Sequence, residues 1–309
     1  MTSRSLATAW KLRSTVLALE HPLIMGILNV TPDSFFDGGR LANVETAVAA
    51  ALSMIEAGAH VIDIGGESTR PGSLPVPLEE EMRRVVPVIQ KLAPQTSVPI
   101  SVDTSKAAVA RASLEAGAEI VNDVTALRGD PEMAAVVAES GAGVVLMHMR
   151  GTPRTMQQSP HYEDVVGEVV TFLREQKHYA IDRGIDSAAI ALDPGIGFGK
   201  RLEDNLRLLA ATPELVSLGH PLVLGYSMKS FIGQVIGDTD LSLREWPTVA
   251  LSAHFALKGE RPFPLLLRVH NVLACLQAVK MTLAVRRAGE LSSPRALAHA
   301  SEAGVKQNL

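Results

Sequence analysis

Polar and charged side chains stand at the ends of short apolar segments along this chain, and their types indicate binding of a small polar ligand. In chain order these residues are Asn29, Asp63 with Glu67, Asp103, Asn122 with Asp123, His148, Asp193, Lys229, and Arg268 with His270. Polar residues are common in loops, but polar residues that directly follow four or five apolar ones are typical of a functional site. We therefore predict that they meet in one binding site.

The mixture of groups indicates a ligand with two chemically different parts. Asp103 and Asp193 can each accept two parallel N–H bonds, and together with Asn122 they suit the donor-rich edge of a planar heterocycle. Arg268 and His270, two residues apart on one strand, would share a face and suit an anion such as a phosphate. Lys229 supplies a further cation.

Two of these residues also have a simpler structural interpretation. Asp193 precedes Pro194 and could form a turn or cap a helix. His148 could be a core histidine whose hydrogen bonds are satisfied within the fold. The sequence alone leaves both interpretations open.

The apolar segments alternate with helical ones, which predicts a (β/α)8 TIM barrel that forms a single domain. The strands are expected at 24–28, 60–66, 98–103, 119–124, 143–149, 189–195, 221–227 and 264–270. Their nearly continuous apolar character is typical of strands buried on both faces of a parallel sheet. Because such a barrel assembles its site at the carboxyl ends of the strands, the polar residues above would converge there.

Helical periodicity fills the intervals between the strands. Helices are expected at 44–58, 78–92, 105–116, 162–183 and 271–288, with another that Asp130 and Pro131 open. Thr104 is expected to cap the helix at 105–116. The predicted divisions are a lead-in with a short hairpin over the barrel floor at 1–22, the barrel at 23–288 and a polar tail at 289–309.

Composition favours a soluble cytoplasmic protein that acts on small molecules. Hydrophobic residues make up 47% of the 309 residues, and the formal net charge is −4. Lys and Arg form no basic stripe, which argues against nucleic acid as a partner. The single cysteine, Cys275, cannot form an internal disulfide, as expected in a reducing cytosol. No segment approaches the ~20 apolar residues of a membrane span, and Glu20 interrupts the first apolar stretch, unlike a secretory signal.

Several familiar motifs are incomplete. DPGIGFGK at 193–200 lacks the G-x-x-x-x-G-K-S/T spacing of a P-loop, and Arg201 stands where Ser or Thr would be. GYSMK at 225–229 lacks the last glycine of a nucleophile elbow. The absence of HExxH and of paired cysteines argues against a tightly held zinc, whereas a magnesium ion held by one side-chain oxygen and by substrate phosphates would leave little trace.

The chain resembles the dihydropteroate synthase family of folate biosynthesis. The resemblance covers about residues 22–290 and rests, in the family's order, on GILNVTPDSFFDGG, DIGGESTRPGS, SVDTSK, IVNDV, LMHMRGTP, LDPGIGFGK, SMKSFIG and RVHNV. It implies a barrel enzyme that joins 4-aminobenzoate to (7,8-dihydropterin-6-yl)methyl diphosphate, giving 7,8-dihydropteroate and diphosphate. It also implies Mg²⁺ as cofactor and a homodimer.

The resemblance further implies roles for residues of this chain. Asn29 would ligate the Mg²⁺ that the diphosphate also holds, and Arg268 with His270 would bind the diphosphate. The pterin would be held by Asp103, Asn122, Asp193 and Lys229, with Met147 near its ring. The aminobenzoate pocket would be shaped by Thr69, Arg70, Pro71, Phe198 and Ser230. Asp33 would steady the cation formed as diphosphate leaves, so the catalytic candidates are Asp33, Lys229, Arg268 and His270.

The chain departs from the family's pattern in three places. The usual SRKS reads SMKS, so Met228 replaces an arginine, and RVHDV reads RVHNV, with Asn271 for aspartate. GERPFP at 259–264 replaces the usual Gly-Ala before the last strand. We expect Met228 to raise the Michaelis constant for one substrate without abolishing activity.

Two alternative functions share this barrel. A methyltransferase domain that holds methyltetrahydrofolate would keep the pterin-binding Asp and Asn residues but has no use for the STRPG loop or for Arg268 with His270. A non-catalytic paralogue that binds pterin or a partner protein is kept open by Met228 and Asn271. Pterin binding without diphosphate-dependent aminobenzoate binding would favour the paralogue.

Overall fold

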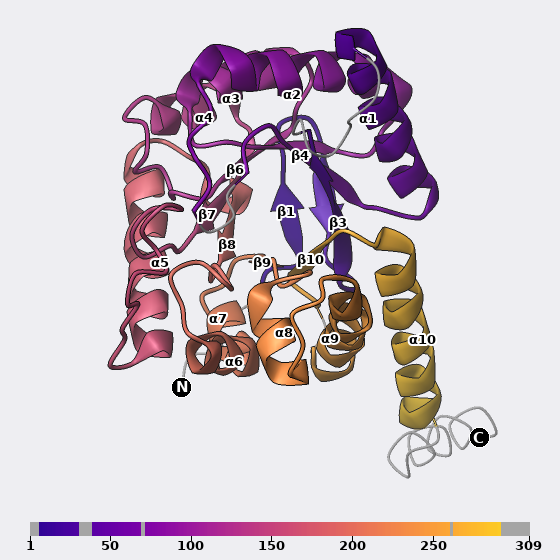
Figure 1. The fold of residues 1–309 in the computed structure, drawn as a ribbon. Coiled ribbons are helices and arrows are strands. Elements are labelled where there is room, and N and C mark those ends of the chain that lie inside the picture. The colour runs from indigo at the N-terminus through magenta and orange to yellow at the C-terminus, as the bar shows by residue number, and fades with distance from the viewer. Residues whose placement is uncertain (1–5, 31–38, 69–71, 260–261, 292–309) are drawn as a thin grey trace, which may run out of the picture.

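Parallel strands close into a barrel at the centre of the molecule (Figure 1). The computed structural model describes residues 6–30, 39–68, 72–259 and 262–291. Around the barrel the strands follow the order β10-β3-β4-β5-β6-β7-β8-β9, and β9 pairs with β10 to close it. The strands are β3 (Leu23–Asn29), β4 (Val61–Gly65), β5 (Ile100–Asp103), β6 (Ile120–Asp123), β7 (Gly143–Met147), β8 (Ile190–Asp193), β9 (Leu222–Leu224) and β10 (Leu265–Val269). The predicted (β/α)8 TIM barrel is confirmed.

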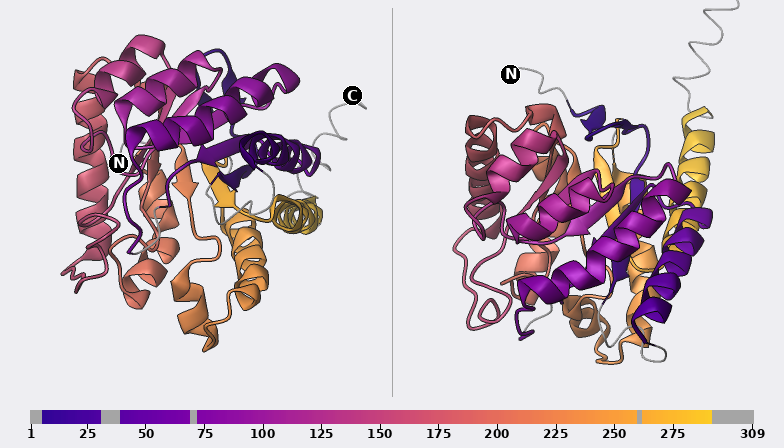
Figure 2. Two further views of the ribbon diagram at one scale, coloured as in Figure 1. Left: turned by 45° about the horizontal axis from the view of Figure 1, so that its top comes forward. Right: turned by 90° about the horizontal axis from the view of Figure 1, so that it is seen from above.

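Helices alternate with the strands along the chain and surround the barrel (Figure 2). They are α1 (Gly39–Glu56), α2 (Leu78–Leu92), α3 (Ala107–Glu115), α4 (Met133–Ser140), α5 (Val165–Asp182), α6 (Leu202–Ala210), α7 (Thr212–Val216), α8 (Ser230–Ile236), α9 (Glu245–Lys258) and α10 (Val272–Leu291). Short 3-10 turns lie at Ala93–Gln95, Ser187–Ala189 and Ser242–Arg244. In the part of the chain that the structure describes, no helix is both long and apolar enough to cross a membrane.

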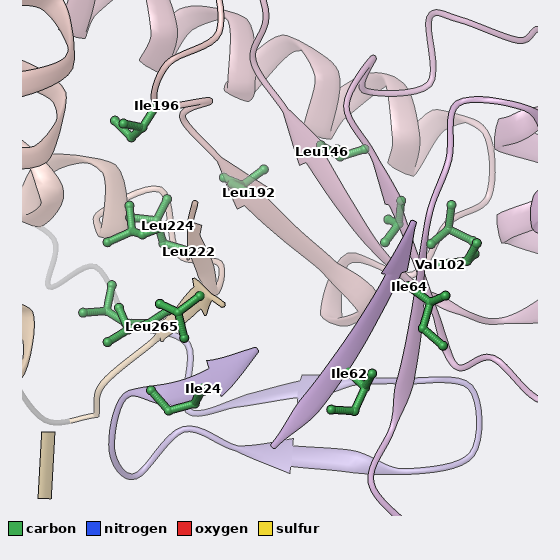
Figure 3. Close-up of a cluster of buried hydrophobic side chains, with 14 of the residues drawn as sticks. Ile24, Ile62, Ile64, Val102, Leu146, Leu192, Ile196, Leu222, Leu224 and Leu265 are labelled. Carbon is green, nitrogen blue, oxygen red and sulfur yellow. The ribbon is translucent and has the colours of Figure 1, made fainter. Parts of the chain in front are cut away.

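Side chains alternate along each barrel strand between the interior and the surrounding helices. On β4, Ile62 and Ile64 pack in the outer apolar layer, part of which is shown in Figure 3. Val61 and Asp63, the intervening residues, face the interior. Because successive side chains of a strand point to opposite faces, both faces of these strands are buried and their sequences are apolar nearly throughout. The inward positions near the carboxyl ends are the exception and hold polar residues.

The hairpin of β1 (Ala9–Lys11) and β2 (Val16–Ala18) closes the amino-terminal end of the barrel (Figure 2). Trp10 has no exposed surface, and its indole Nε1–H donates to the carbonyl oxygen of Ala189 at 2.8 Å, next to the start of β8. Trp10 and Leu12 pack against inward-facing residues of the barrel strands. The hairpin predicted over the barrel floor is therefore confirmed, and the polar interior lies at the opposite end.

Several helix boundaries differ from the predicted ones, and for α3 a residue distant in sequence supplies the cap. The helix expected at 105–116 begins at Ala107. The Ala107 N–H donates to Asp130 Oδ2 at 2.9 Å, whereas Thr104 Oγ1 accepts from the Lys106 N–H at 3.2 Å. The prediction that Thr104 caps this helix was therefore wrong. The largest other differences are that α1 begins at Gly39 rather than Val44, α5 begins at Val165 rather than Tyr162, and α10 ends at Leu291 rather than Ala288.

Candidate active site

A pocket opens at the carboxyl ends of the strands, where the sequence placed the polar residues. It is lined by Asp103, Asn122, Val124, Met147, Asp193, Gly195, Ile196, Phe198, Gly225, Lys229 and Arg268. Adjacent strands bring these residues together, because Asp103 pairs in register with Asn122, and Met147 with Asp193. Among the residues predicted to bind substrate, the pocket gathers Asp103, Asn122, Met147, Asp193, Phe198, Lys229 and Arg268.

Arg268 is held by two carboxylates, Asp103 in the pocket lining and the buried Asp63. Its Nε donates to Asp63 Oδ2 at 2.6 Å, and its Nη2 donates to Asp103 Oδ2 at 2.7 Å. Asn122 Nδ2 donates to the same oxygen of Asp63 at 3.0 Å. Asp63 is fully buried, so it joins Arg268 and Asn122 away from water. From the sequence, Asp63 was included among the site residues, but its pairing with Arg268 and Asn122 was not predicted. The signal was present, because a carboxylate inside a buried strand requires a partner.

Burial raises the pKa of both pocket carboxyls. The pKa of Asp103 is raised to about 7 by burial, against the opposing effect of the Arg268 charge. The pKa of Asp193 is raised to about 6 by burial, and the Gly195 N–H that donates to Oδ1 at 2.7 Å opposes the shift. Asp193 Oδ2 lies near Gly225 on the pocket wall. Each carboxylate is thus poorly solvated and gains from N–H donors that a ligand brings.

An apolar wall faces the carboxylates across the pocket. Val124, Met147, Met149, Met156 and Phe198 form one buried cluster. Lys229 Nζ lies 4.0 Å from the centroid of the Phe198 ring, within the range of a cation–π contact. An apolar wall opposite hydrogen-bond acceptors is suited to a flat ring that carries donors along one edge.

Three predicted residues lie at the same end of the barrel but outside this lining. Asn29 ends β3 and is half-buried, and Ser230 begins α8 and is exposed. His270 follows β10, and its ring Nδ1 lies 3.0 Å from Ser227 Oγ. The backbone N–H of His270 donates to the same Ser227 Oγ at 3.3 Å, so Ser227 orients this histidine.

The first two loops carry the remaining predicted residues. Asp33, Thr69, Arg70 and Pro71 lie outside the described residues. Glu67, which precedes the second of these segments, pairs with Lys106, and Lys106 also pairs with the buried Glu81. The beginning of the second loop is thereby tied to the beginnings of α2 and α3.

His148 does not face the pocket. It directly follows Met147, the last residue of β7, and the alternation of the strand turns it outward. Its ring contacts Phe172 of α5 edge-on at 4.8 Å, and its Nδ1 lies 2.9 Å from Lys200 Nζ. The prediction that His148 joins the strand-end site was wrong, and its interpretation as a satisfied core histidine is correct.

Asn29, the last residue of β3, carries an amide oxygen, which is a type of ligand that Mg²⁺ accepts. Among the described residues, no group of three or more His, Cys, Asp or Glu side chains is arranged to hold a metal. Mg²⁺ usually keeps one or two protein ligands and completes its shell with waters and substrate phosphates. The residues present therefore fit a magnesium ion that arrives with a phosphate-bearing substrate.

Asn271 has a clear local role as a helix cap. Its Oδ1 accepts from the Ala274 N–H at 3.0 Å at the start of α10, and its Nδ2 donates to Glu245 of α9. An aspartate could make the first of these bonds but not the second, because a carboxylate has no N–H to donate.

Met228 adopts an unusual backbone conformation beside Lys229. Its φ is 60°, in the left-handed region that residues other than glycine seldom adopt. The Met228 N–H donates to Thr248 Oγ1 at 3.2 Å, and the Met228 carbonyl oxygen accepts from Arg244 Nη1 at 3.2 Å. The turn that presents Lys229 is therefore held by Arg244, which ends the 3-10 turn Ser242–Arg244, and by Thr248 of α9.

Known proteins match the chain over most of its length. Residues 25–270 match the family of pterin binding enzymes. The dihydropteroate synthase of Synechocystis sp. is 46% identical over 264 residues, which cover 85% of this chain and 90% of that protein. The dihydropteroate synthase of Escherichia coli is 44% identical over 278 residues, which cover 90% and 96%.

Solved structures with the same fold hold the compounds of one reaction. Dihydropteroate synthase from Xanthomonas albilineans with 4-aminobenzoic acid superposes with a TM-score of 0.83 at 46% identity, covering 91% of this chain and 98% of that one. The same enzyme in complex with 7,8-dihydropteroate gives a TM-score of 0.80 at 45% identity, covering 90% and 98%. The chain therefore belongs to the pterin binding enzyme family, and within that family to the dihydropteroate synthases.

Proposed function

We infer that this protein is a dihydropteroate synthase that joins (7,8-dihydropterin-6-yl)methyl diphosphate to 4-aminobenzoate, giving 7,8-dihydropteroate and diphosphate. The observation that carries this function is the pocket in which Asp103, Asn122 and Asp193 face an apolar wall. A pterin is a flat ring with several N–H donors, so it matches both sides of this pocket. The identities of 46% and 44% to named synthases support the same reaction.

The pterin is bound, in this proposal, at the bottom of the pocket. Asp103 and Asp193 accept its N–H groups as carboxylates, and Asn122 donates and accepts beside them. Met147 packs near the ring, and Lys229 adds a positive charge at the rim. Neutral N–H donors relieve the poor solvation of the two carboxylates without introducing a further charge.

The reaction exchanges a C–O bond for a C–N bond. The amine of 4-aminobenzoate attacks the pterin methylene carbon, diphosphate leaves with the C–O electron pair, and the attacking nitrogen loses one proton. An aniline nitrogen is a fair nucleophile, so the main barrier is departure of the diphosphate. We assign stabilisation of that charge to Arg268 and His270, with Ser227 orienting the histidine. Asp33 steadies the pterin cation as the bond breaks.

Asn29 would hold the Mg²⁺ ion together with diphosphate oxygens. When bound, this ion supplies charge neutralisation for the leaving group. In this proposal the aminobenzoate binds beside Phe198 and Ser230, and Thr69, Arg70 and Pro71 contribute to its recognition. Its carboxylate can then reach the exposed first turn of α8, where Ser230 lies.

Product formation tests the function directly. We expect 7,8-dihydropteroate from the two substrates with Mg²⁺, and loss of product when a chelator removes the ion. Asp193→Asn keeps the size of the side chain but removes its charge, and we expect kcat/KM to fall by about 100-fold, near 3 kcal/mol, because a buried acceptor becomes partly a donor.

Asp186→Asn is the matched control, because Asp186 is half exposed and pairs with Lys11 at the other end of the barrel. Its kinetics should equal those of wild type. If folded wild-type protein bound dihydropterin but formed no product under any of these conditions, the chain would be a non-catalytic paralogue.

We also propose that two copies of the chain associate through a surface of α9 and α10, and that the protein acts in the cytoplasm. Trp246 and Leu257 of α9 are 73% and 55% exposed, and Met281 and Val285 of α10 are 66% and 62% exposed. α9 and α10 pack against one another (Figure 1). Exposed apolar residues gathered on neighbouring helices favour contact with another protein surface. The buried thiol of Cys275 agrees with a reducing compartment.

A further inference from the structure

Lys200 ends the glycine-rich loop after β8 and is almost completely buried. Its exposed fraction is 3%, and its Nζ reaches back into the loop that it terminates. Nζ donates to the carbonyl oxygen of Phe198 at 3.0 Å and lies 2.9 Å from Nδ1 of His148. A buried lysine needs such partners, yet neither Lys200 nor His148 lines the pocket or takes part in the proposed reaction.

The glycine-rich loop lies directly on the backbone that follows β7. Gly195 has a φ of +67°, and a Cβ there would stand 1.9 Å from the His148 carbonyl oxygen. Gly199 has a φ of +62°, and a Cβ there would stand 2.6 Å from the Arg150 carbonyl oxygen. These glycines therefore serve close packing of two loops, which Lys200 joins by hydrogen bonds.

The loop is not arranged to bind phosphate through its backbone. The Gly195 N–H donates to Asp193 at 2.7 Å, and the Gly197 N–H donates to Asn205 Oδ1 at 2.6 Å. A phosphate-binding loop would instead present such N–H groups to the ligand. The glycines and the lysine of this loop thus need an explanation other than anion binding.

His148 acts as a fixed acceptor for the lysine. Its ring is held from outside by Phe172 of α5. Burial, and then the neighbouring Lys200 charge, lower the pKa of His148 to about 2, so the ring is neutral and can accept at Nδ1. Burial also lowers the pKa of Lys200, to about 7. The contact needs no permanent charge, because a neutral amine still has hydrogens to donate.

Phe198 connects this buried contact to the pocket. The Phe198 carbonyl oxygen faces Lys200, and its ring packs with Met147 and lies against Lys229 Nζ. We propose that Lys200, with His148 as its acceptor, is a positioning residue that fixes Phe198 and thereby sets the width of the aminobenzoate side of the pocket. This role rests on the proposed function.

Lys200→Met tests the role, because methionine keeps the apolar stem but makes none of the hydrogen bonds. We expect the KM for 4-aminobenzoate to rise about tenfold, as loss of one buried hydrogen bond would give. The Kd of the dihydropterin diphosphate, measured by titration calorimetry, should stay within about twofold of wild type. Phe198 is one part of the apolar wall beside the pterin, but Met147 and the polar partners Asp103, Asn122 and Asp193 are untouched. Lys258→Met, at the exposed end of α9, is the matched control.

Two histidine variants test the acceptor. His148→Leu removes Nδ1 and should reproduce the rise in KM, and it should add little in the Lys200→Met background because both act on one contact. His148→Asn places an amide oxygen near the position of Nδ1 and should restore most of the affinity for 4-aminobenzoate. Hydrogen exchange at 195–199 should speed up in Lys200→Met and not in Lys258→Met.

Two results would overturn the proposal. One is an unchanged KM for 4-aminobenzoate in Lys200→Met. The other is an equal weakening of both substrates together with a lowered melting temperature, which would mean that Lys200 only stabilises the fold. A wild-type protein that makes no dihydropteroate would contradict the proposed function instead, and the exchange measurement would still decide whether Lys200 holds the loop.

Discussion

Asp63 and Asp103 both pair with Arg268, and this arrangement affects the pKa of Asp103 and therefore the pH dependence of the pocket. The guanidinium of Arg268 pairs with both carboxylates, yet burial still leaves the pKa of Asp103 raised to about 7. A carboxyl group with a raised pKa stabilises the folded protein most below its ordinary pKa of 3.8. That contribution is lost as the pH rises through about 7. The affinity for the ligand changes with pH in the opposite direction and rises as the pH rises, because only the ionised group accepts N–H donors at both oxygens.

Dihydropterin binding should therefore weaken on acidification. We expect the Kd to be about tenfold higher at pH 6 than at pH 8, because one group with a pKa near 7 must lose its proton. Titration calorimetry across this range measures the change. Asp103→Asn should bind weakly at every pH with a flatter profile, whereas an equally flat wild-type profile would contradict the role of Asp103.

Met228 gives a second prediction at the level of single residues. Met228→Arg introduces a cation beside Lys229, as the resemblance to the SRKS motif implies, so we expect the KM of one anionic substrate to fall by about fivefold, near 1 kcal/mol. Steady-state kinetics with each substrate varied in turn will show which one responds. Met228→Gln, which is polar but uncharged, should leave both constants unchanged. Unchanged kinetics in the arginine variant would show that Met228 does not weaken the binding of either substrate.

Helices of this barrel are joined by polar contacts at their ends as well as by apolar packing. Asp130 accepts from the first N–H of α3, and Asn271 caps α10 while donating to Glu245 of α9. Both contacts bridge elements that are distant in sequence or separated by a strand. Local sequence therefore predicts that a helix begins nearby, but not which residue caps it.

Asn271→Asp tests the contact between α9 and α10. The aspartate keeps the cap on Ala274 but sets its carboxylate against that of Glu245, so we expect a loss of about 1 kcal/mol in the free energy of unfolding. Urea denaturation measures the loss. Adding Glu245→Gln to the Asn271→Asp variant removes the repulsion and should recover most of the lost stability, and a fully stable single variant would contradict this explanation.

Across the whole molecule, the positions of the strands could be predicted from the sequence, but the side-chain pairs between distant strands could not. Segments such as 60–66 are apolar nearly throughout, which indicates strands buried on both faces. Eight such segments that alternate with helices predict a barrel. The two-residue period also places Asp103 and Asp193 inward. The same period turns His148 outward, because His148 is one residue beyond Met147, the last residue of β7. The sequence did not predict this, because the end of a strand cannot be located to within one residue. The pairing of Asp63 with Arg268 depends on barrel closure, which joins residues far apart in the chain.

Self-association can be tested on the surface of α9 and α10. We expect a dimer by light scattering coupled to size exclusion, and a monomer for the double variant Trp246→Glu with Met281→Glu, because burying two carboxylates at an apolar contact is costly. Leu206→Glu, which changes an exposed leucine of α6, is the control and should remain dimeric. A monomeric wild type at micromolar concentration would contradict the proposed surface.

One tryptophan of the chain is buried and the other is exposed, so their intrinsic fluorescence can report on the protein without a label. Trp10 has no exposed surface, whereas Trp246 is 73% exposed. In the monomer, ultraviolet excitation should thus give a blue emission from Trp10 that iodide cannot quench and a red, quenchable emission from Trp246. Unfolding would shift the first signal to the red, and subunit association would shift the second to the blue. One unlabelled sample can therefore report folding and assembly separately.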